Sequence, residues 1–103
     1  MNQPKELLSI GTFANMTRLS IKALRLYDQL DLLQPHHVDA QTGYRYYSAE
    51  QLSPARMIRN LREMDMPLAT IRQVLAALAD SPKQAEVLAR DYLSMREKQI
   101  EQL

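Results

Sequence analysis

The sequence predicts a mainly α-helical fold in which a small β-hairpin interrupts the helices and a long helix ends the chain. Three observations support this fold class. Residues 9–28 contain two short segments with helically spaced apolar side chains, joined by a polar turn. Residues 36–47 place aromatic and β-branched residues on both sides of a polar loop that ends in glycine. From residue 82 onward, a helical pattern continues without interruption.

The first two segments are expected to pack crosswise as a helix-turn-helix. In the first, Ile10, Phe13 and Ala14 lie on one helical face. In the second, Ser20 is placed as the N-cap. The apolar face of the second consists of Leu19, Ala23, Leu24 and Tyr27. Helices this short need each other's apolar faces to be stable, which favours the pair over two separate elements.

The second helix is expected to hold its cations away from that packed face. The outward residues are Lys22, Arg25, Leu26 and Gln29, with Arg18 just before the cap. A short helix with cations on one side suits a groove lined with phosphates. Arg25 is the stronger candidate for a two-bond contact, because its guanidinium is a planar fork and the Lys22 ammonium is a point charge. The alternative is that these are ordinary solvated charges.

A β-hairpin is expected next, with strands at 36–38 and 44–47 around the loop 39–43. Arg45 shares a strand face with Tyr47. Arg45 either contacts phosphates beside the second helix or pairs with Asp28 to brace the hairpin, and both can hold together. His36 and His37 are neighbours on a strand, so their side chains diverge and we expect no metal site there.

Two further helices are expected before residue 80. Ser48 and Gln51 form a capping-box pattern for the first of them. Pro54 predicts either a kink or a single turn at 48–52 followed by a restart capped by Ser53. The buried stripe of this helix is expected to comprise Leu52, Met57, Ile58, Leu61 and Met64. The next helix is expected to begin with Pro67 in its first turn, with a stripe of Leu68, Ile71, Val74, Leu75 and Leu78.

The last helix carries an apolar stripe wider than a single coiled-coil seam. At about 1.5 Å per residue it is expected to be roughly 33 Å long, longer than a compact domain of this size. Part of the stripe therefore overhangs, and a second copy of the chain is the simplest partner. The pattern continues to the last residue without a C-cap, so we expect a truncated coiled-coil helix. We divide the chain into a DNA-binding domain at 1–80 and a dimerisation helix at 81–103.

Composition narrows the function classes. The chain of 103 residues has no cysteine, which excludes disulfides, thiolate metal sites and iron–sulfur clusters. The net charge of +1 divides into +3 over residues 1–62 (eight Lys/Arg, five Asp/Glu) and −2 over 63–103 (five against seven). A basic N-terminal part is typical of a chain that binds a polyanion with one end. A membrane span, a signal peptide and a catalytic nucleophile–base set are missing from the pattern. We therefore expect a cytoplasmic, nucleoid-associated protein that is not an enzyme and needs no cofactor.

The order of these elements resembles the MerR family of transcriptional regulators. The blocks that carry the resemblance are SIG (9–11), LSIKALR (19–25), YD (27–28), LLQP (32–35), GYRYYS (43–48) and LREM (61–64). Among the branches of the family, IKALRLYD and GYRYYS are most similar to the multidrug-sensing one. Two positions depart from the family pattern. Leu26 stands where a second tyrosine is common, and could touch a thymine methyl instead. Arg18 stands where glycine is common, in a left-handed turn.

The resemblance implies a homodimer, joined by antiparallel terminal helices, on a palindromic promoter in double-stranded DNA. Such regulators untwist and bend the promoter when an effector binds, which realigns its elements for RNA polymerase. The resemblance also implies that the small-molecule effector binds a C-terminal domain outside this chain. Arg62 is expected to contact DNA as part of a second wing, Arg59 is left open, and Arg56 is expected to be simply solvated.

The predicted site residues form two sets. The DNA-binding set is Arg18, Lys22, Arg25, Leu26, Tyr27, Arg45, Arg59 and Arg62, with the Tyr27 ring in the core and its hydroxyl on a phosphate. The dimerisation set is Leu88, Tyr92, Leu93, Met95, Arg96, Ile100 and Leu103. Two alternatives stay open: an architectural, excisionase-like protein that bends DNA, and a helical domain whose cations meet an acidic protein.

Overall fold

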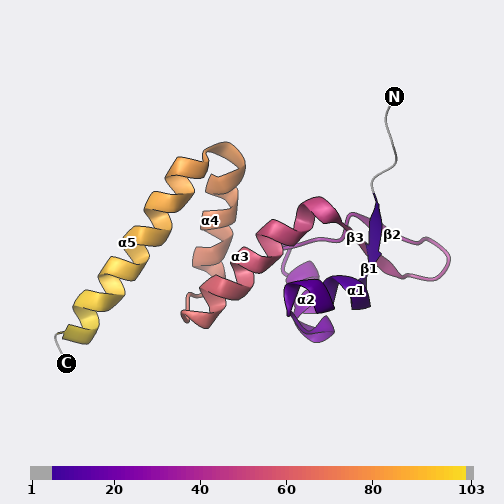
Figure 1. Ribbon diagram of the computed structural model, residues 1–103, viewed down its shortest axis with the longest axis horizontal. Helices are drawn as coiled ribbons and strands as arrows, with labels where there is room; N and C mark the ends of the chain where they lie inside the picture. The colour runs from indigo at the N-terminus through magenta and orange to yellow at the C-terminus, as the bar shows by residue number, and fades with distance from the viewer. Residues whose placement is uncertain (1–5, 102–103) are drawn as a thin grey trace. The chain divides into compact units, whose positions relative to one another are not determined.

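The computed structural model describes residues 6–101, and within the last helix it describes the side chains of residues 83, 86–88 and 90–95. The fold is mainly helical, as predicted. In chain order the elements are β1 (Leu7–Ser9), α1 (Ile10–Thr17), α2 (Ile21–Gln29), β2 (His37–Val38), β3 (Arg45–Ser48), the 3₁₀ turn η1 (Ala49–Gln51), α3 (Leu52–Glu63), α4 (Leu68–Asp80) and α5 (Pro82–Glu101) (Figure 1).

These elements form two compact units, residues 1–64 and residues 65–103. The first unit contains everything from β1 to α3, and the second contains α4 and α5. The division at residue 80 predicted from the sequence separates two functions, and it stays a prediction.

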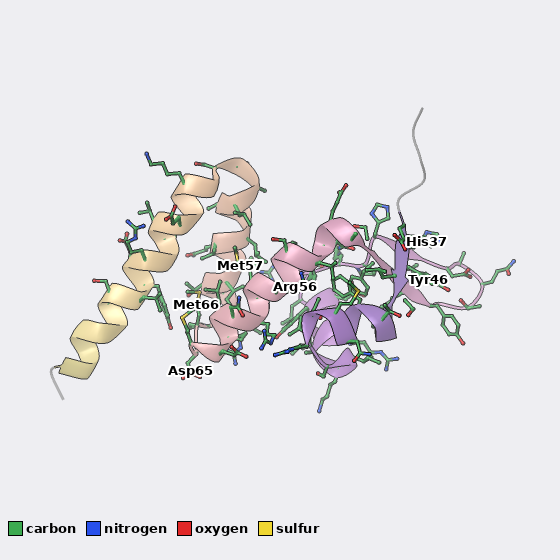
Figure 2. The ribbon with its side chains drawn as sticks, viewed as in Figure 1. His37, Tyr46, Arg56, Met57, Asp65 and Met66 are labelled. Atoms are coloured by element: carbon green, nitrogen blue, oxygen red, sulfur yellow. The ribbon has the colours of Figure 1, made fainter. Side chains whose placement is uncertain are left out.

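A three-stranded antiparallel sheet with the order β1-β3-β2 lies in the first unit. The hairpin formed by β2 and β3 was predicted, and His37 faces Tyr46 across it with ring centroids 6.2 Å apart (Figure 2). The third strand, β1, was not predicted. It pairs Leu7 with Ser48 and Ser9 with Tyr46. A three-residue strand has no pattern of its own, and its partner lies about 40 residues away along the chain.

Helices α1 and α2 form the predicted helix-turn-helix. The Ser9 side chain accepts a hydrogen bond from the Thr12 amide, and the Ser20 side chain accepts one from the Ala23 amide, so each helix has a side-chain cap. Between them, Arg18 ends α1 in the left-handed conformation, with φ 60° and ψ 27°. Leu24 and Tyr27 are buried, as the apolar face of α2 predicted.

The core of the first unit is built on a stacked aromatic pair. The Phe13 and Tyr47 rings are nearly parallel, with centroids 4.2 Å apart and an interplanar angle of 12°, and both side chains are fully buried. From α3, Ala55, Ile58 and Leu61 are buried as well. The aromatic stack joins α1 to β3, and so joins the helix-turn-helix to the sheet.

Three expectations for α3 are corrected. Of the two alternatives expected for Pro54, the single turn before the helix is confirmed by η1. The helix that follows is capped by Gln51 and not by Ser53. Pro54 is then the third helical residue, where the missing amide has no intrahelical partner to lose. Met64 is not part of the buried stripe, because α3 ends at Glu63 and the Met64 side chain is 37% exposed. Arg56 is not simply solvated, since its terminal nitrogen donates to the Met16 carbonyl at 3.2 Å.

The second unit is a helical hairpin in which α4 packs along α5 (Figure 1). Pro67 is the N-cap of α4, one position earlier than the first-turn place predicted. Ile71 and Val74 of α4 are buried. From α5, the Tyr92 hydroxyl donates to the Asp65 carbonyl at 3.3 Å. This bond ties α5 to the turn that precedes α4.

Candidate nucleic-acid interface

The outer face of α2 is exposed, as predicted. Lys22, Arg25, Leu26 and Gln29 are all exposed, and they line a shallow surface hollow together with Ser20 and Ala23. Leu26 is 43% exposed, so its side chain is accessible on the same face as the two cations. The cap at Ser20 fixes where α2 begins, so it also fixes which residues face outward.

Arg18 and Tyr27, the two other predicted residues of the helix-turn-helix, differ in exposure. Arg18 is exposed in the left-handed turn before α2. Tyr27 is 6% exposed, which confirms that its ring belongs to the core. Contact of its hydroxyl with a phosphate stays a prediction.

The hairpin of β2, β3 and their loop, which we call the wing, has its loop stabilised by Asp39. The Asp39 carboxylate accepts from the Gln41 amide at 2.8 Å and from the Thr42 amide at 3.0 Å. These two amides lower the pKa of Asp39 below its ordinary value of 3.8. Gly43 takes a positive φ of 74°, and Tyr44 beside it is 66% exposed.

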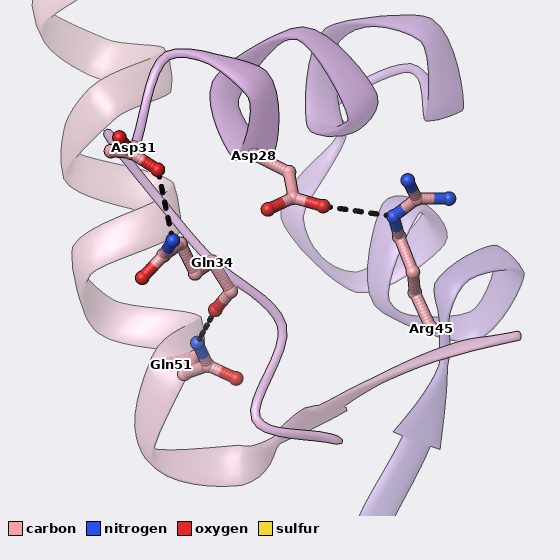
Figure 3. A network of polar contacts seen from close by, with 5 residues as sticks. All are labelled: Asp28, Asp31, Gln34, Arg45 and Gln51. Atoms are coloured by element: carbon pink, nitrogen blue, oxygen red, sulfur yellow. Dashed lines mark hydrogen bonds and ion pairs between the residues drawn. The ribbon is translucent and has the colours of Figure 1, made fainter. Parts of the chain in front are cut away.

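The wing is tied to α2 by an ion pair. The Arg45 Nε donates to Asp28 Oδ2 at 2.9 Å, with side-chain exposures of 33% and 22% (Figure 3). This is the bracing contact predicted as one of the two roles of Arg45. In Figure 3 the two terminal nitrogens of the guanidinium lie on the side away from Asp28. Contact of those nitrogens with DNA stays a prediction.

A pocket of about 260 Å³ separates the wing from the start of α1 and the exposed side of α2. Arg25 and Arg45 both line it, and so do Gly43 and Tyr44; its remaining lining residues are Ser9, Ile10 and Tyr46. The sequence predicted both arginines as site residues, but it did not predict that they line the same pocket. The alternation in GYRYY puts Arg45 on the face opposite Tyr44 and Tyr46, but does not say what that face meets.

The two remaining cations of the predicted DNA-binding set lie on α3. Arg59 pairs with Glu63 one turn later, at 3.1 Å. Arg62 lies in the last turn of α3 and is exposed. Exposed pairs of this kind are weak, so the Glu63 contact leaves Arg59 able to exchange partners.

The predicted dimerisation residues lie on α5. Leu88, Tyr92 and Leu93 are half-buried, and Met95 is 54% exposed. Arg96 and Ile100 have side chains outside the described ones, and Leu103 is outside the described residues altogether.

Metal binding and membrane insertion have no structural support in the part of the chain described. Among residues 6–101, no three His, Cys, Asp or Glu side chains gather as a metal ion requires. Over the same residues, every helix is too short or too polar to cross a bilayer.

Comparison with known proteins gives a consistent family. Residues 8–78 match the model of the MerR HTH family regulatory proteins. The chain is 42% identical over 65 residues to the Multidrug-efflux transporter 1 regulator of Bacillus subtilis, covering 63% of this chain and 23% of that protein. It is 36% identical over 93 residues to the transcriptional regulator BrlR of Pseudomonas aeruginosa, covering 88% and 34%. The chain thus spans about a quarter to a third of the length of these relatives.

Solved structures agree with the fold. MtaN, the N-terminus of a multidrug transporter activator of Bacillus subtilis, superposes with a TM-score of 0.70 at 24% identity, covering 92% of this chain and 89% of that one. SkgA of Caulobacter crescentus, an HTH-type transcriptional regulator, gives 0.60 at 29% identity, covering 96% and 70%. The proteins of this family are DNA-binding transcription regulators and not enzymes. The chain belongs to the MerR family of helix-turn-helix transcriptional regulators.

Proposed function

We propose that this chain is the promoter-binding part of a homodimeric MerR-type activator that reads a palindromic operator. In this proposal α2 enters the major groove and the wing lies on the adjacent phosphate backbone. One observation supports it above the others: Lys22, Arg25 and Leu26 are exposed on α2, while Leu24 and Tyr27 on the opposite face are buried. A helix that keeps its cations out of the core has them available for DNA.

The proposed chemistry divides among the exposed residues. Arg25 makes the bidentate contact, to a guanine edge or to a phosphate, because its fork has two parallel donors. Lys22, Arg18 and the α3 cations Arg59 and Arg62 neutralise phosphates. Leu26 takes apolar contact with a thymine methyl group.

Dimerisation through α5 is part of the proposal. A single helix-turn-helix buries too little surface for tight binding, and a two-fold dimer doubles the contact on a palindrome. The exposed Met95 and the partly exposed Leu88 and Leu93 support α5 as the partner surface. Sedimentation of wild type and Met95→Glu tests this part: we expect a dimer that the substitution weakens, and a wild type that stays monomeric at high concentration contradicts it.

Activation by DNA distortion is proposed from family membership. A related structure is that of the EcmrR–DNA complex in EcmrR-RPo, which has 23% identity to this chain and a TM-score of 0.64. Transcription in vitro from a promoter with an over-long spacer separates an activator from a protein that merely bends DNA. The activator raises the transcript level on that template but not on one with an ordinary spacer.

The binding claim is tested by selection from a random duplex pool, followed by titration of the selected duplex. We expect a two-fold symmetric motif that the chain prefers over a scrambled duplex, with affinity falling steeply as salt rises. Arg25→Ala should abolish this preference at unchanged melting temperature. Arg90→Ala is the matched control, since Arg90 is an exposed helical arginine on α5, paired with Glu86. Equal binding of the selected and scrambled duplexes by the wild type overturns the proposal.

A further inference from the structure

Asp28 is an acidic residue at a surface that is proposed to face a polyanion. It lies near the end of α2, two turns or less from Lys22 and Arg25, and its side chain is 22% exposed. A carboxylate in this place repels DNA phosphates, so electrostatics alone would favour its absence. Its ion pair with Arg45 suggests what outweighs that repulsion.

The ion pair with Asp28 leaves the two terminal amino groups of Arg45 available for another contact. Asp28 engages the guanidinium through Nε alone, at 2.9 Å. The two terminal nitrogens lie on the far side of the group (Figure 3), and Arg45 lines the same pocket as Arg25. Among the residues that the structure describes, the Arg45 side chain makes no second hydrogen bond. A guanidinium held by Nε can still offer two parallel donors to another oxyanion.

The sheet fixes the backbone of Arg45, so only its side chain can still change conformation. Arg45 pairs with Val38 of β2 in the register of the sheet, and Tyr47, two residues on, is fully buried against Phe13. A free arginine side chain samples many rotamers, and holding it in one conformation before binding removes that cost from the bound state.

We propose that Asp28 is a positioning residue for DNA binding: it holds the Arg45 guanidinium by Nε so that the two terminal amino groups bind one backbone phosphate at the pocket shared with Arg25. This inference rests on the proposed function. It adds to that function an acid that strengthens the binding of a polyanion.

The sign of the effect separates positioning from a simple charge effect. If Asp28 acts only through its charge, then Asp28→Asn removes a repulsion and tightens DNA binding. If Asp28 positions Arg45, then the same change loosens binding, and it does so only while Arg45 is present. A purely structural role would lower the melting temperature but would leave the number of phosphate contacts unchanged.

The test uses the whole chain and a duplex selected from a random pool by the wild type. Affinity is measured from low to moderate salt for wild type, Asp28→Asn, Arg45→Ala and the double variant. For Asp28→Asn we expect about tenfold weaker binding, the lower end for one charge-assisted hydrogen bond. We also expect a slope of log affinity against log salt that is shallower by about 0.9, the value for one phosphate contact. In the Arg45→Ala background, Asp28→Asn should cause no further weakening, and should tighten binding slightly because it removes an unpaired carboxylate that repels phosphates.

Two more variants complete the design. Asp31→Asn is the matched control, because it removes the same charge three residues away. There the carboxylate accepts from the side-chain amide of Gln34 and, within residues 6–101, forms no ion pair. It should bind as tightly as wild type or slightly tighter, with an unchanged slope. Asp28→Glu keeps a carboxylate able to re-form the pair, and should keep the wild-type slope even if its melting temperature falls.

The outcomes for the two proposals are distinct. A wild type without preference for any duplex overturns the proposed function. A wild type that does select a duplex, while Asp28→Asn binds it equally or more tightly, overturns the positioning role alone. An equal loss from Asp28→Asn with and without Arg45 overturns it as well, because the effect then does not pass through that arginine.

Discussion

Replacing Arg18 with glycine should make the protein more stable and at the same time a weaker DNA binder. Arg18 ends α1 with φ 60° and ψ 27°. For a residue with a Cβ atom this conformation costs about 1–2 kcal/mol relative to the right-handed region. Glycine has no such penalty, but it loses about 0.5–1 kcal/mol more conformational entropy on folding. The net gain is therefore about 0.5–1 kcal/mol.

The comparison variant is Arg18→Ala, which removes the same charge but keeps the Cβ atom. Both substitutions should weaken binding to the selected duplex equally, because each removes the same proposed phosphate contact. Only the glycine should raise the stability, and against alanine the difference should be about 2–8 °C in melting temperature for a domain of this size.

Thermal unfolding followed by circular dichroism measures this difference directly. Two other residues, Asp31 and Asp65, also have left-handed conformations, with φ of 56° and 59°, and serve as a comparison for Arg18. Aspartate tolerates that region better than arginine, so glycine should gain less at those two positions. A glycine variant at position 18 no more stable than the alanine variant would refute the strain argument.

The other predictions concern caps, the core and the wing. Ser20→Ala removes the side chain that accepts from the Ala23 amide, and should cost about 1 kcal/mol in urea unfolding; no loss contradicts the cap. The Tyr47 hydroxyl is buried with no hydrogen-bond partner among the described residues, so Tyr47→Phe should match or exceed wild-type stability, and a clear loss would reveal a partner. Burial raises the pKa of Tyr47 above 10.0, helped by the Asp28 charge. Below pH 10 the free energy of unfolding of the wild type should therefore not depend on the ionisation of Tyr47. It should fall as the pH rises through the higher pKa of the folded protein, and Tyr47→Phe should not show this fall. The NMR signals of the Gln41 and Thr42 amides should titrate with a midpoint below pH 3.8. The ionised Asp39 carboxylate accepts from these amides, and the bonds are lost as the pH falls through its lowered pKa. A midpoint at or above 3.8 contradicts this.

Features encoded by near neighbours could be predicted from the sequence. The cap at Ser20 and the loop closed by Gly43 each depend on residues within one turn of the chain, whereas the left-handed turn at Arg18 was expected from the family resemblance. The outward face of α2 followed from helical spacing alone. Lys22, Arg25 and Leu26 were named as candidate DNA-binding residues on that basis, and their exposure on α2 agrees with it.

Features that depend on distant contacts could not be predicted. Strand β1 needs β3, and Arg56 needs the Met16 carbonyl at the end of α1. For Arg45, the sequence predicted phosphate contact and pairing with Asp28 as two roles that can hold together. Only the position of β3 relative to α2 shows that the pairing forms. The prediction that Met64 is buried was wrong for a different reason. The helix ends one residue before Met64, so helical periodicity no longer predicts which way its side chain faces.

The pairing of β1 with β3 has a consequence for the order in which the chain folds. Joining Leu7 to Ser48 closes a loop of roughly 40 residues, which costs about 3 kcal/mol of chain entropy before any contact rewards it. The hairpin of α4 and α5 closes through a connection of one residue, Ser81. During synthesis the first strand must wait until residue 48 has left the ribosome, whereas α1 and α2 can pack together once residue 29 has emerged. Within the first unit, docking of the N-terminal strand is therefore expected after the packing of α1 and α2, although that strand contains Ser9, the N-cap of the first helix of the DNA-binding motif.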